Sequence, residues 1–177
     1  MAAFGSTLRT WLDRLYLASG ITASLFLILI LLLIVSQMVA RWSGAVLTGA
    51  PDYTGYAMAA SSFLALPYAL NKGAHIRVSL LLNALGKRAR VWAEIWCFGI
   101  GSFLSVFFAY YAIKATRESL KWNDISQGQD ASPLWIPQIA MCVGTVILAI
   151  AFIDHLVTLL FTGNHNITED SLESHAE

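Results

Sequence analysis

Residues 66–85, LPYALNKGAHIRVSLLLNAL, are the stretch that decides the fold. An apolar segment ends at Leu70, and a polar turn, NKGAH, follows it at 71–75. A short amphipathic run that carries Arg77 then leads into the basic residues Lys87, Arg88 and Arg90. This order predicts a membrane span that turns into a helix lying on the bilayer surface.

The composition supports a membrane protein. Hydrophobic residues make up 57% of the chain and charged residues only 12%, with a mean hydropathy of +0.63, whereas a soluble domain usually carries about 25% charged residues. Four runs of at least 19 residues lack Asp, Glu, Lys and Arg, namely 15–40, 53–71, 95–113 and 131–153. Since a helix needs about 20 residues to cross the hydrocarbon core, we predict an all-α integral membrane protein. Its four transmembrane helices are expected at about 15–40, 53–71, 91–114 and 133–161.

The spans belong to one membrane domain, 1–162, which includes two further amphipathic segments and is followed by a tail. Residues 6–16 carry apolar side chains at helical spacing, so they either lie in the interface or extend the first span. Residues 76–90 have one polar and one apolar face but are too short and too charged to cross the membrane. We expect them at the surface, with Lys and Arg near phospholipid phosphates. Residues 163–177 form a polar tail.

The distribution of Lys and Arg predicts the orientation. Seven of these residues lie in the N-terminal segment and the loop after the second span, against four on the opposite side. The positive-inside rule therefore places both termini in the cytoplasm. The first apolar run is too long for a cleavable signal peptide. The net charge of zero gives no reason to expect nucleic-acid binding.

Small residues recur along two of the predicted spans. Ala57, Ser61 and Ala65 are spaced by four in the second span, and Gly101 and Ser105 are spaced by four in the third. In lipid, helices associate where small side chains let their backbones approach closely. These stripes are predicted packing faces, either within the chain or against another subunit.

Ionisable residues are absent from the middle of every predicted span. Glu94, Lys114 and Asp154 fall near helix ends, where we expect them to extend to the interface. The Asp154-His155 pair is the best remaining candidate for a polar contact with a partner or a lipid headgroup. Trp135 is expected to anchor the start of the last span. The sequence shows no nucleophile motif, zinc-ligand spacing or phosphate-binding loop, so no enzymatic activity and no cofactor are expected.

Two other functions stay open at this point. His75 and His155 could both lie at the cytoplasmic interface, so a haem- or quinone-binding membrane anchor of a respiratory enzyme is conceivable. A small transporter or channel acting alone is the other alternative. It would require ionisable groups at the membrane midplane.

The chain resembles the small membrane subunit of tripartite ATP-independent periplasmic (TRAP) transporters, the DctQ-like family. The resemblance rests on GAHIRV at 73–78 followed by leucines, on SPLWIP at 132–137, and on the four spans and chain length. Ser79 departs from the family pattern, which commonly has an acidic residue there.

The resemblance implies a division of labour. A soluble periplasmic protein would deliver an organic anion to the membrane pair, and the large multi-span subunit would carry the substrate and sodium sites and move as an elevator. The small subunit would be a fixed scaffold in a bacterial inner membrane. The expected surface anchors are His75, Arg77, Lys87, Arg88 and Arg90. The substrate cannot be read from this chain.

Overall fold

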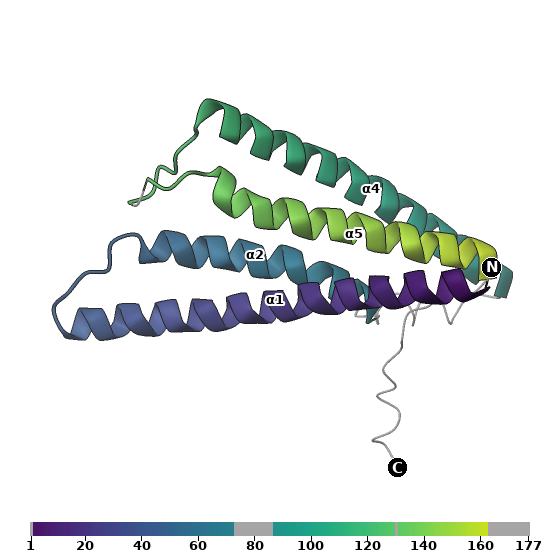
Figure 1. The fold of residues 1–177 in the computed structure, drawn as a ribbon, viewed down its shortest axis with the longest axis horizontal. Coiled ribbons are helices and arrows are strands. Elements are labelled where there is room, and N and C mark those ends of the chain that lie inside the picture. Colours follow the sequence, from purple (N-terminus) through teal and green to yellow (C-terminus); the bar gives the residue numbers. More distant parts are fainter. Residues whose placement is uncertain (1, 73–86, 130, 163–177) are drawn as a thin grey trace, which may run out of the picture.

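The computed structural model describes residues 2–72, 87–129 and 131–162, and these residues form four α-helices. They are α1 (Ala2–Trp42), α2 (Ala50–Asn71), α4 (Lys87–Trp122) and α5 (Trp135–Thr162). Figure 1 shows two helical hairpins whose connecting loops lie at one end, opposite the N-terminus. We call these the loop end and the N-terminal end. The predicted all-α fold is confirmed.

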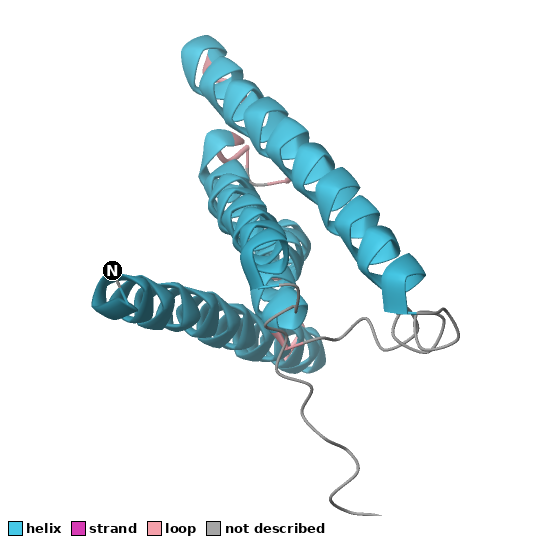
Figure 2. Cartoon of the chain, turned by 90° about the vertical axis from the view of Figure 1, so that its right-hand side faces the viewer, coloured by secondary structure: helices cyan, strands magenta, loops and turns pink. Residues whose placement is uncertain are grey.

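The helices form an open row instead of a square bundle. α1 packs along α2, α2 along α5, and α5 along α4, whereas α1 and α5 touch only slightly. Among the described helices, α4 packs mainly against α5, and it touches α2 where the rings of Phe108 and Phe63 stack with centroids 5.9 Å apart. The end-on view in Figure 2 shows this arrangement. α2 and α5 are therefore the central helices, and α1 and α4 are the edges.

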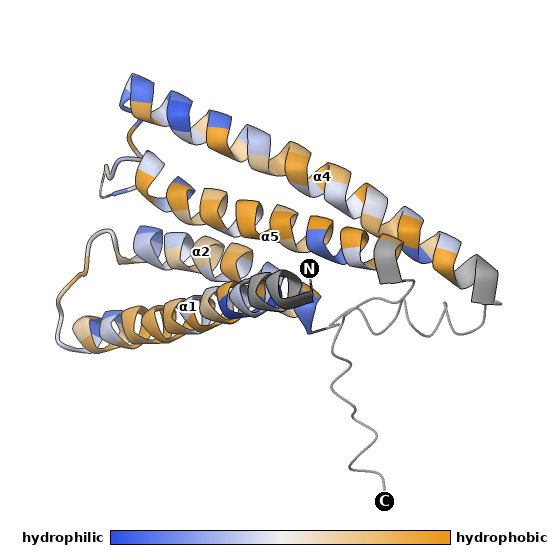
Figure 3. Cartoon of the chain, turned by 45° about the vertical axis from the view of Figure 1, so that its right-hand side comes forward, coloured by the Kyte–Doolittle hydropathy of each residue, from blue (hydrophilic) through white to orange (hydrophobic). Residues whose placement is uncertain are grey.

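Three of the helices are both long and apolar enough to cross a membrane: Arg9–Trp42, Val91–Trp122 and Trp135–Leu160. α2 is shorter, with 22 residues, and Figure 3 shows it paler than α1 and α5 because Ala, Ser and Gly replace Leu and Ile. Its length of about 33 Å still matches a hydrocarbon core of about 30 Å. Neighbouring helices on both sides shield it, which is consistent with its lower hydropathy.

Two predicted boundaries differ from the structure. α1 runs without a break from Ala2 to Trp42, so residues 6–16 extend the first span and form no separate helix. Residues 87–90, the last part of the predicted surface helix 76–90, form one helix with the third span, and their position at the bilayer surface stays a prediction. The rest of that predicted surface helix and the tail 163–177 lie outside the described residues. α4 also continues about two turns beyond the predicted end at 114.

The helix ends explain the sharp reversals at the loop end. Gly44, with φ +77°, follows α1, and the N–H of Ala45 donates to the carbonyl of Ala40 at 2.9 Å. This is the hydrogen-bond pattern of a Schellman cap, which requires a left-handed residue. Asn123 (φ +49°) takes the same place after α4, and Gly49 (φ +81°) precedes α2.

The two central helices approach each other at backbone distance. A Cβ atom on Gly144 of α5 would lie only 2.6 Å from the carbonyl oxygen of Phe63 in α2. No side chain larger than hydrogen fits there without moving a backbone. Close approach of this kind drives helix association in lipid, so Gly144 fixes the spacing of the central pair.

Candidate functional site

The predicted stripe on α2 faces its neighbours in the row. Ala57 and Ser61 are buried and Ala65 is half-buried. The hydroxyl of Ser61 donates to the carbonyl oxygen of Ala23 in α1 at 3.1 Å. This stripe therefore lies against helices of the same chain.

The predicted stripe on α4 also faces inward. Ser105 is buried, and its hydroxyl donates to the carbonyl of Ser102 in the same helix at 3.0 Å. A Cβ atom on Gly101 would collide with the ring of Phe152 in α5. The stripes were predicted to pack either within the chain or against another subunit. In the structure both stripes make contacts within the chain.

The predicted lipid anchors are mostly beyond what the structure describes. Trp135 is the first residue of α5 and is half-buried. His75 and Arg77 lie outside the described residues. Lys87, Arg88 and Arg90 are placed by their backbone in α4, and their side chains are not described. Their role at the bilayer surface stays a prediction.

Three buried polar residues lie toward the N-terminal end of the row, and we call them the buried polar cluster. It consists of Tyr16 on α1, Glu94 on α4 and His155 on α5, whose exposed fractions are 0%, 4% and 1%. The expectation that Glu94 extends to the interface is wrong, because its side chain is enclosed. Of the Asp154-His155 pair, proposed to contact a partner or a lipid headgroup, His155 is enclosed. Asp154 is half-buried, and its contact stays a prediction.

The surroundings of this cluster join three helices. The His155 ring lies 5.8 Å from the Phe98 ring, measured between centroids, and Phe98 lies 6.4 Å from Phe152. Tyr16 of α1 belongs to a buried apolar core with Ile147 and Ala151 of α5, and Phe98 and Phe152 pack against that core. A buried carboxylate is tolerated only with polar or charged partners, so these residues make a specific contact region and are not interchangeable apolar packing.

The sequence did contain a signal for the burial of Glu94. Glu94, Gly101 and Ser105 are spaced by seven and four residues, which places all three on one side of an α-helix. Since Gly101 and Ser105 were predicted to pack, Glu94 should have been assigned to the same inward face. Glu94 was assigned to the interface because it lies near a helix end, and that position along the helix does not determine which side of the helix it occupies.

A second polar cluster, which we call the loop clasp, joins the two hairpins at the loop end. It consists of Asp52 and Tyr56 from α2 and Ser126 and Gln129 from the loop after α4. The Gln129 N–H donates to Oδ2 of Asp52 at 2.9 Å, and the Tyr56 hydroxyl donates to Oγ of Ser126 at 2.6 Å. The side-chain oxygen of Gln129 also accepts from the N–H of Gly49 at 3.5 Å.

The loop clasp requires a glycine at 128. A Cβ atom there would overlap the carboxylate of Asp52. No feature of the sequence pointed to these contacts, which join residues about 70 to 80 positions apart. The loop clasp joins the loop after α4 to the start of α2, so it holds the two hairpins together at the loop end.

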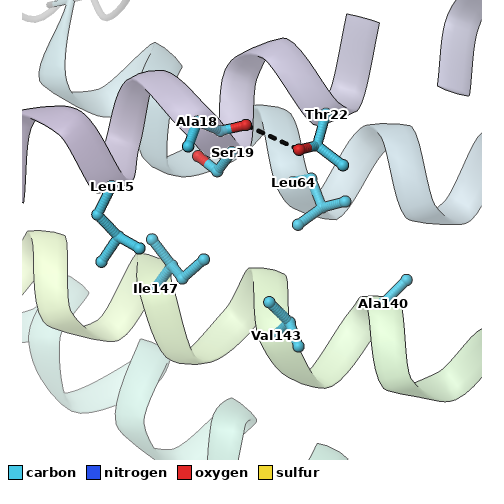
Figure 4. A pocket seen from close by; sticks show the side chains of 8 residues that line it. All are labelled: Leu15, Ala18, Ser19, Thr22, Leu64, Ala140, Val143 and Ile147. Carbon is cyan, nitrogen blue, oxygen red and sulfur yellow. Dashed lines mark hydrogen bonds between the residues drawn. The ribbon is translucent and has the colours of Figure 1, made fainter. Parts of the chain in front are cut away.

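An apolar groove runs between α1 and α5 over α2 (Figure 4). It has a volume of about 320 Å³ and is lined by Leu15, Ala18, Ser19, Thr22, Leu64, Ala140, Val143 and Ile147. Both hydroxyls in the lining donate to carbonyls of α1 itself, Ser19 to Tyr16 and Thr22 to Ala18, each at 2.8 Å. The lining therefore offers no charged group to an organic anion. Within the described ranges, no group of three His, Cys, Asp or Glu residues is placed to hold a metal ion.

Comparison with known proteins gives one finding on family. A family model described as "Tripartite ATP-independent periplasmic transporters, DctQ component" matches residues 30–162. This segment covers 133 of the 177 residues and includes α2, α4, α5 and the second part of α1. The chain has no significant match among curated proteins or among solved structures.

Proposed function

Because the chain belongs to the DctQ family, the small membrane component of TRAP transporters, we propose that it is the non-catalytic scaffold of a sodium-coupled uptake system for organic anions. As a member of this family it is a multi-pass, non-enzymatic membrane subunit. In the proposal, a periplasmic binding protein delivers the anion, and the large membrane subunit carries the sodium and substrate sites.

The observation that carries the scaffold role is that small and polar residues on the inward faces of the helices make contacts within the chain. Ser61 bonds to α1, Gly101 and Gly144 allow close helix contact, and the loop clasp and the buried polar cluster join the helices at both ends. A transport pathway needs polar or ionisable groups near the midplane that face a cavity. The groove between α1 and α5 is instead apolar, and its hydroxyls bond to their own helix.

The proposed location is a bacterial inner membrane, with both termini in the cytoplasm. The supporting observation is the excess of Lys and Arg on the N-terminal side of the row. We further propose that Arg77 and the 87–90 cluster hold the chain at the phospholipid surface. Replacing these basic residues with Gln should lower assembly of the membrane complex. Unchanged assembly and uptake would contradict this role.

Reconstitution tests the scaffold role directly. Proteoliposomes with an inward sodium gradient should take up a radiolabelled anion when they contain the large subunit, the binding protein and this chain. Candidate anions are C4-dicarboxylates, keto acids and sialic acids. Uptake should fall to background when this chain is left out or is the sole membrane protein. Transport by this chain alone would overturn the proposal.

The haem- or quinone-binding alternative gains no support from the described residues. Their one histidine, His155, is enclosed and packs against Phe98. The other three histidines lie outside the described ranges. An absorption spectrum of the purified complex separates the two functions, because bound haem would give a Soret band.

A further inference from the structure

One side of the edge helix α4 carries a line of large aromatic side chains, which we call the aromatic face. Their exposed fractions lie between 52% and 70%. The members are Trp92, Trp96, Phe103, Phe107 and Tyr110. Their spacings of four, seven, four and three residues place them on one side of an α-helix, and from first to last they extend about 27 Å along its axis.

The aromatic face points away from the rest of the chain. The buried residues of α4, which include Ser105, Ala109 and Ala112, lie on the opposite side of the helix and face α5. The one ring contact between α4 and α2, Phe108 with Phe63, does not involve these five residues, so no described part of the chain covers the aromatic face.

Several of these rings already support one another. The centroids of Phe103 and Phe107 are 6.4 Å apart, those of Phe107 and Tyr111 are 4.6 Å apart, and those of Tyr110 and Tyr111 are 5.3 Å apart. Rings held by their neighbours lose little conformational entropy when a partner covers them. The free-energy cost of ordering a surface before binding is therefore small here.

The other edge of the row has a different chemistry. The outward side of α1 is aliphatic, with exposed residues such as Leu25, Ile28 and Leu32, and such side chains suit lipid tails. Trp and Tyr near span ends are commonly explained by the aromatic belts of the interface. That explanation does not apply to Phe103 and Phe107, because they lie near the centre of the charge-free run 95–113, away from the span ends.

We infer that the aromatic face of α4 docks on an apolar transmembrane helix of the large membrane subunit, and that the outward side of α1 faces lipid. The identity of the partner rests on the proposed function, whereas the choice of face rests on the contrast between the two edges. In lipid, helix association depends on van der Waals packing, and rigid aromatic side chains supply large contact areas.

The available area agrees with a specific interface. An aromatic side chain buries roughly 150–250 Å² when fully covered. At the observed exposures, the five residues offer about 500–800 Å². A standard interface uses about 800 Å² per partner, and the neighbouring exposed residues Ile100, Leu104 and Tyr111 supply the remainder.

Site-specific photocrosslinking in the assembled complex tests the choice of face. The photoreactive amino acid benzoyl-phenylalanine would replace Phe103 or Phe107 on α4, and Leu25 or Leu32 on α1 as matched controls. Illumination of membranes that contain the complete transporter should give adducts with the large subunit from the α4 positions. The yield from the α1 positions should be about tenfold lower, the ratio that corresponds to a 1.4 kcal/mol preference.

A pair of double variants provides a second measurement. F103L/F107L keeps both positions apolar, so the chain should still insert and its own thermal unfolding should be unchanged. Co-purification of the large subunit should fall about tenfold or more, as expected when two central contact residues are truncated. The matched α1 variant L25A/L32A should retain the large subunit.

Three outcomes would overturn the choice of face. They are stronger crosslinking from α1 than from α4, adducts between two copies of this chain, and adducts with lipid alone at Phe103 and Phe107. Failure of the proposed function looks different. In that case, the unmodified chain would not co-purify with the large subunit, and no position on either helix would crosslink to it.

Discussion

The two ends of the helix row are closed by different kinds of interaction. At the N-terminal end, Tyr16, Glu94 and His155 are enclosed between helices, and aromatic rings pack around them. At the loop end, the clasp between Asp52 and Gln129 and between Tyr56 and Ser126 consists of hydrogen bonds between loops and the start of α2. One end is held by burial and the other by directional bonds at partly exposed positions.

This difference predicts how the stability of each end responds to substitutions. Loss of an enclosed side chain leaves a cavity that the surrounding helices fill only in part. Loss of a hydrogen bond near water is partly compensated by solvent. The N-terminal end should therefore be the less tolerant of the two. The central contact at Gly144, which lies between the ends, should be less tolerant than either.

The largest effect is expected from Gly144→Leu, which would push the central helices apart and disconnect the two ends. The added side chain would collide with the backbone of Phe63, and a backbone cannot move aside by a rotamer change as a side chain can. We expect a loss of about 3 kcal/mol or more in the free energy of unfolding. Unfolding in detergent micelles would measure it.

The matched control for this change is Gly99→Leu. A Cβ atom on Gly99 has no neighbour within 4 Å, so the variant should gain up to about 0.5–1 kcal/mol from higher helix propensity. Equal stability of the two variants would mean that the close contact between α2 and α5 does not exist.

At the N-terminal end, His155→Ala should remove the buried ring that packs on Phe98 and leave a cavity between α4 and α5. The expected loss in the free energy of unfolding is about 2–3 kcal/mol. Ile153→Ala, two residues away on the exposed side of the same helix, should cost much less. Thermal unfolding of both variants decides whether burial closes this end, and similar costs would contradict it.

At the loop end, Tyr56→Phe should cost about 1 kcal/mol, because the Oγ atom of Ser126 loses its hydroxyl donor. Asp52→Ala should cost about 1.5 kcal/mol, the lower end for loss of a charge-assisted bond, because water partly replaces the Gln129 N–H contact at this partly exposed place. Ser62→Ala is the control, because its hydroxyl bonds only within α2. Hydrogen exchange of the Gln129 amide would report opening of the clasp.

The smallest effects should come from the helix caps at the loop end. Gly44→Ala adds no contact, because nothing lies within 4 Å of the new Cβ atom. The substitution should still lower the free energy of unfolding by about 1 kcal/mol, because the φ of +77° at this position is left-handed. Asn123→Gly should instead raise the free energy of unfolding by a few tenths of a kcal/mol. Its φ of +49° is left-handed, a conformation that glycine adopts without steric cost. If both variants were destabilising, the left-handed caps would not be the cause.

Most of the fold could be read from the sequence because a membrane imposes a simple rule on it. Charge-free runs of sufficient length become helices, and small residues at a spacing of four mark close contacts. The structure accordingly places Ser61 against α1 and Gly101 against Phe152. The order of the helices in the row could not be read, since all four have an apolar side that could face either lipid or protein.

The polar clusters were harder to predict, for two separate reasons. Glu94 and His155 were assigned to the interface from their depth alone, although their position around the helix axis is what decides burial. The loop clasp joins loop residues to the start of a helix, and loops have no periodicity to interpret. A contact such as that between Asp52 and Gln129 depends on the whole topology, which is known only once the hairpins are placed.

The length of α1 has a consequence for how the row sits in a bilayer. Its charge-free run, residues 15–40, is about 39 Å long, whereas a hydrocarbon core measures about 30 Å. Relief of this hydrophobic mismatch by rotation alone would need a tilt of about 40°, the upper limit seen for membrane helices. Because Ser61 bonds α2 to α1, α2 must share part of that inclination. A row tilted in this way would cover more bilayer area than four upright helices would.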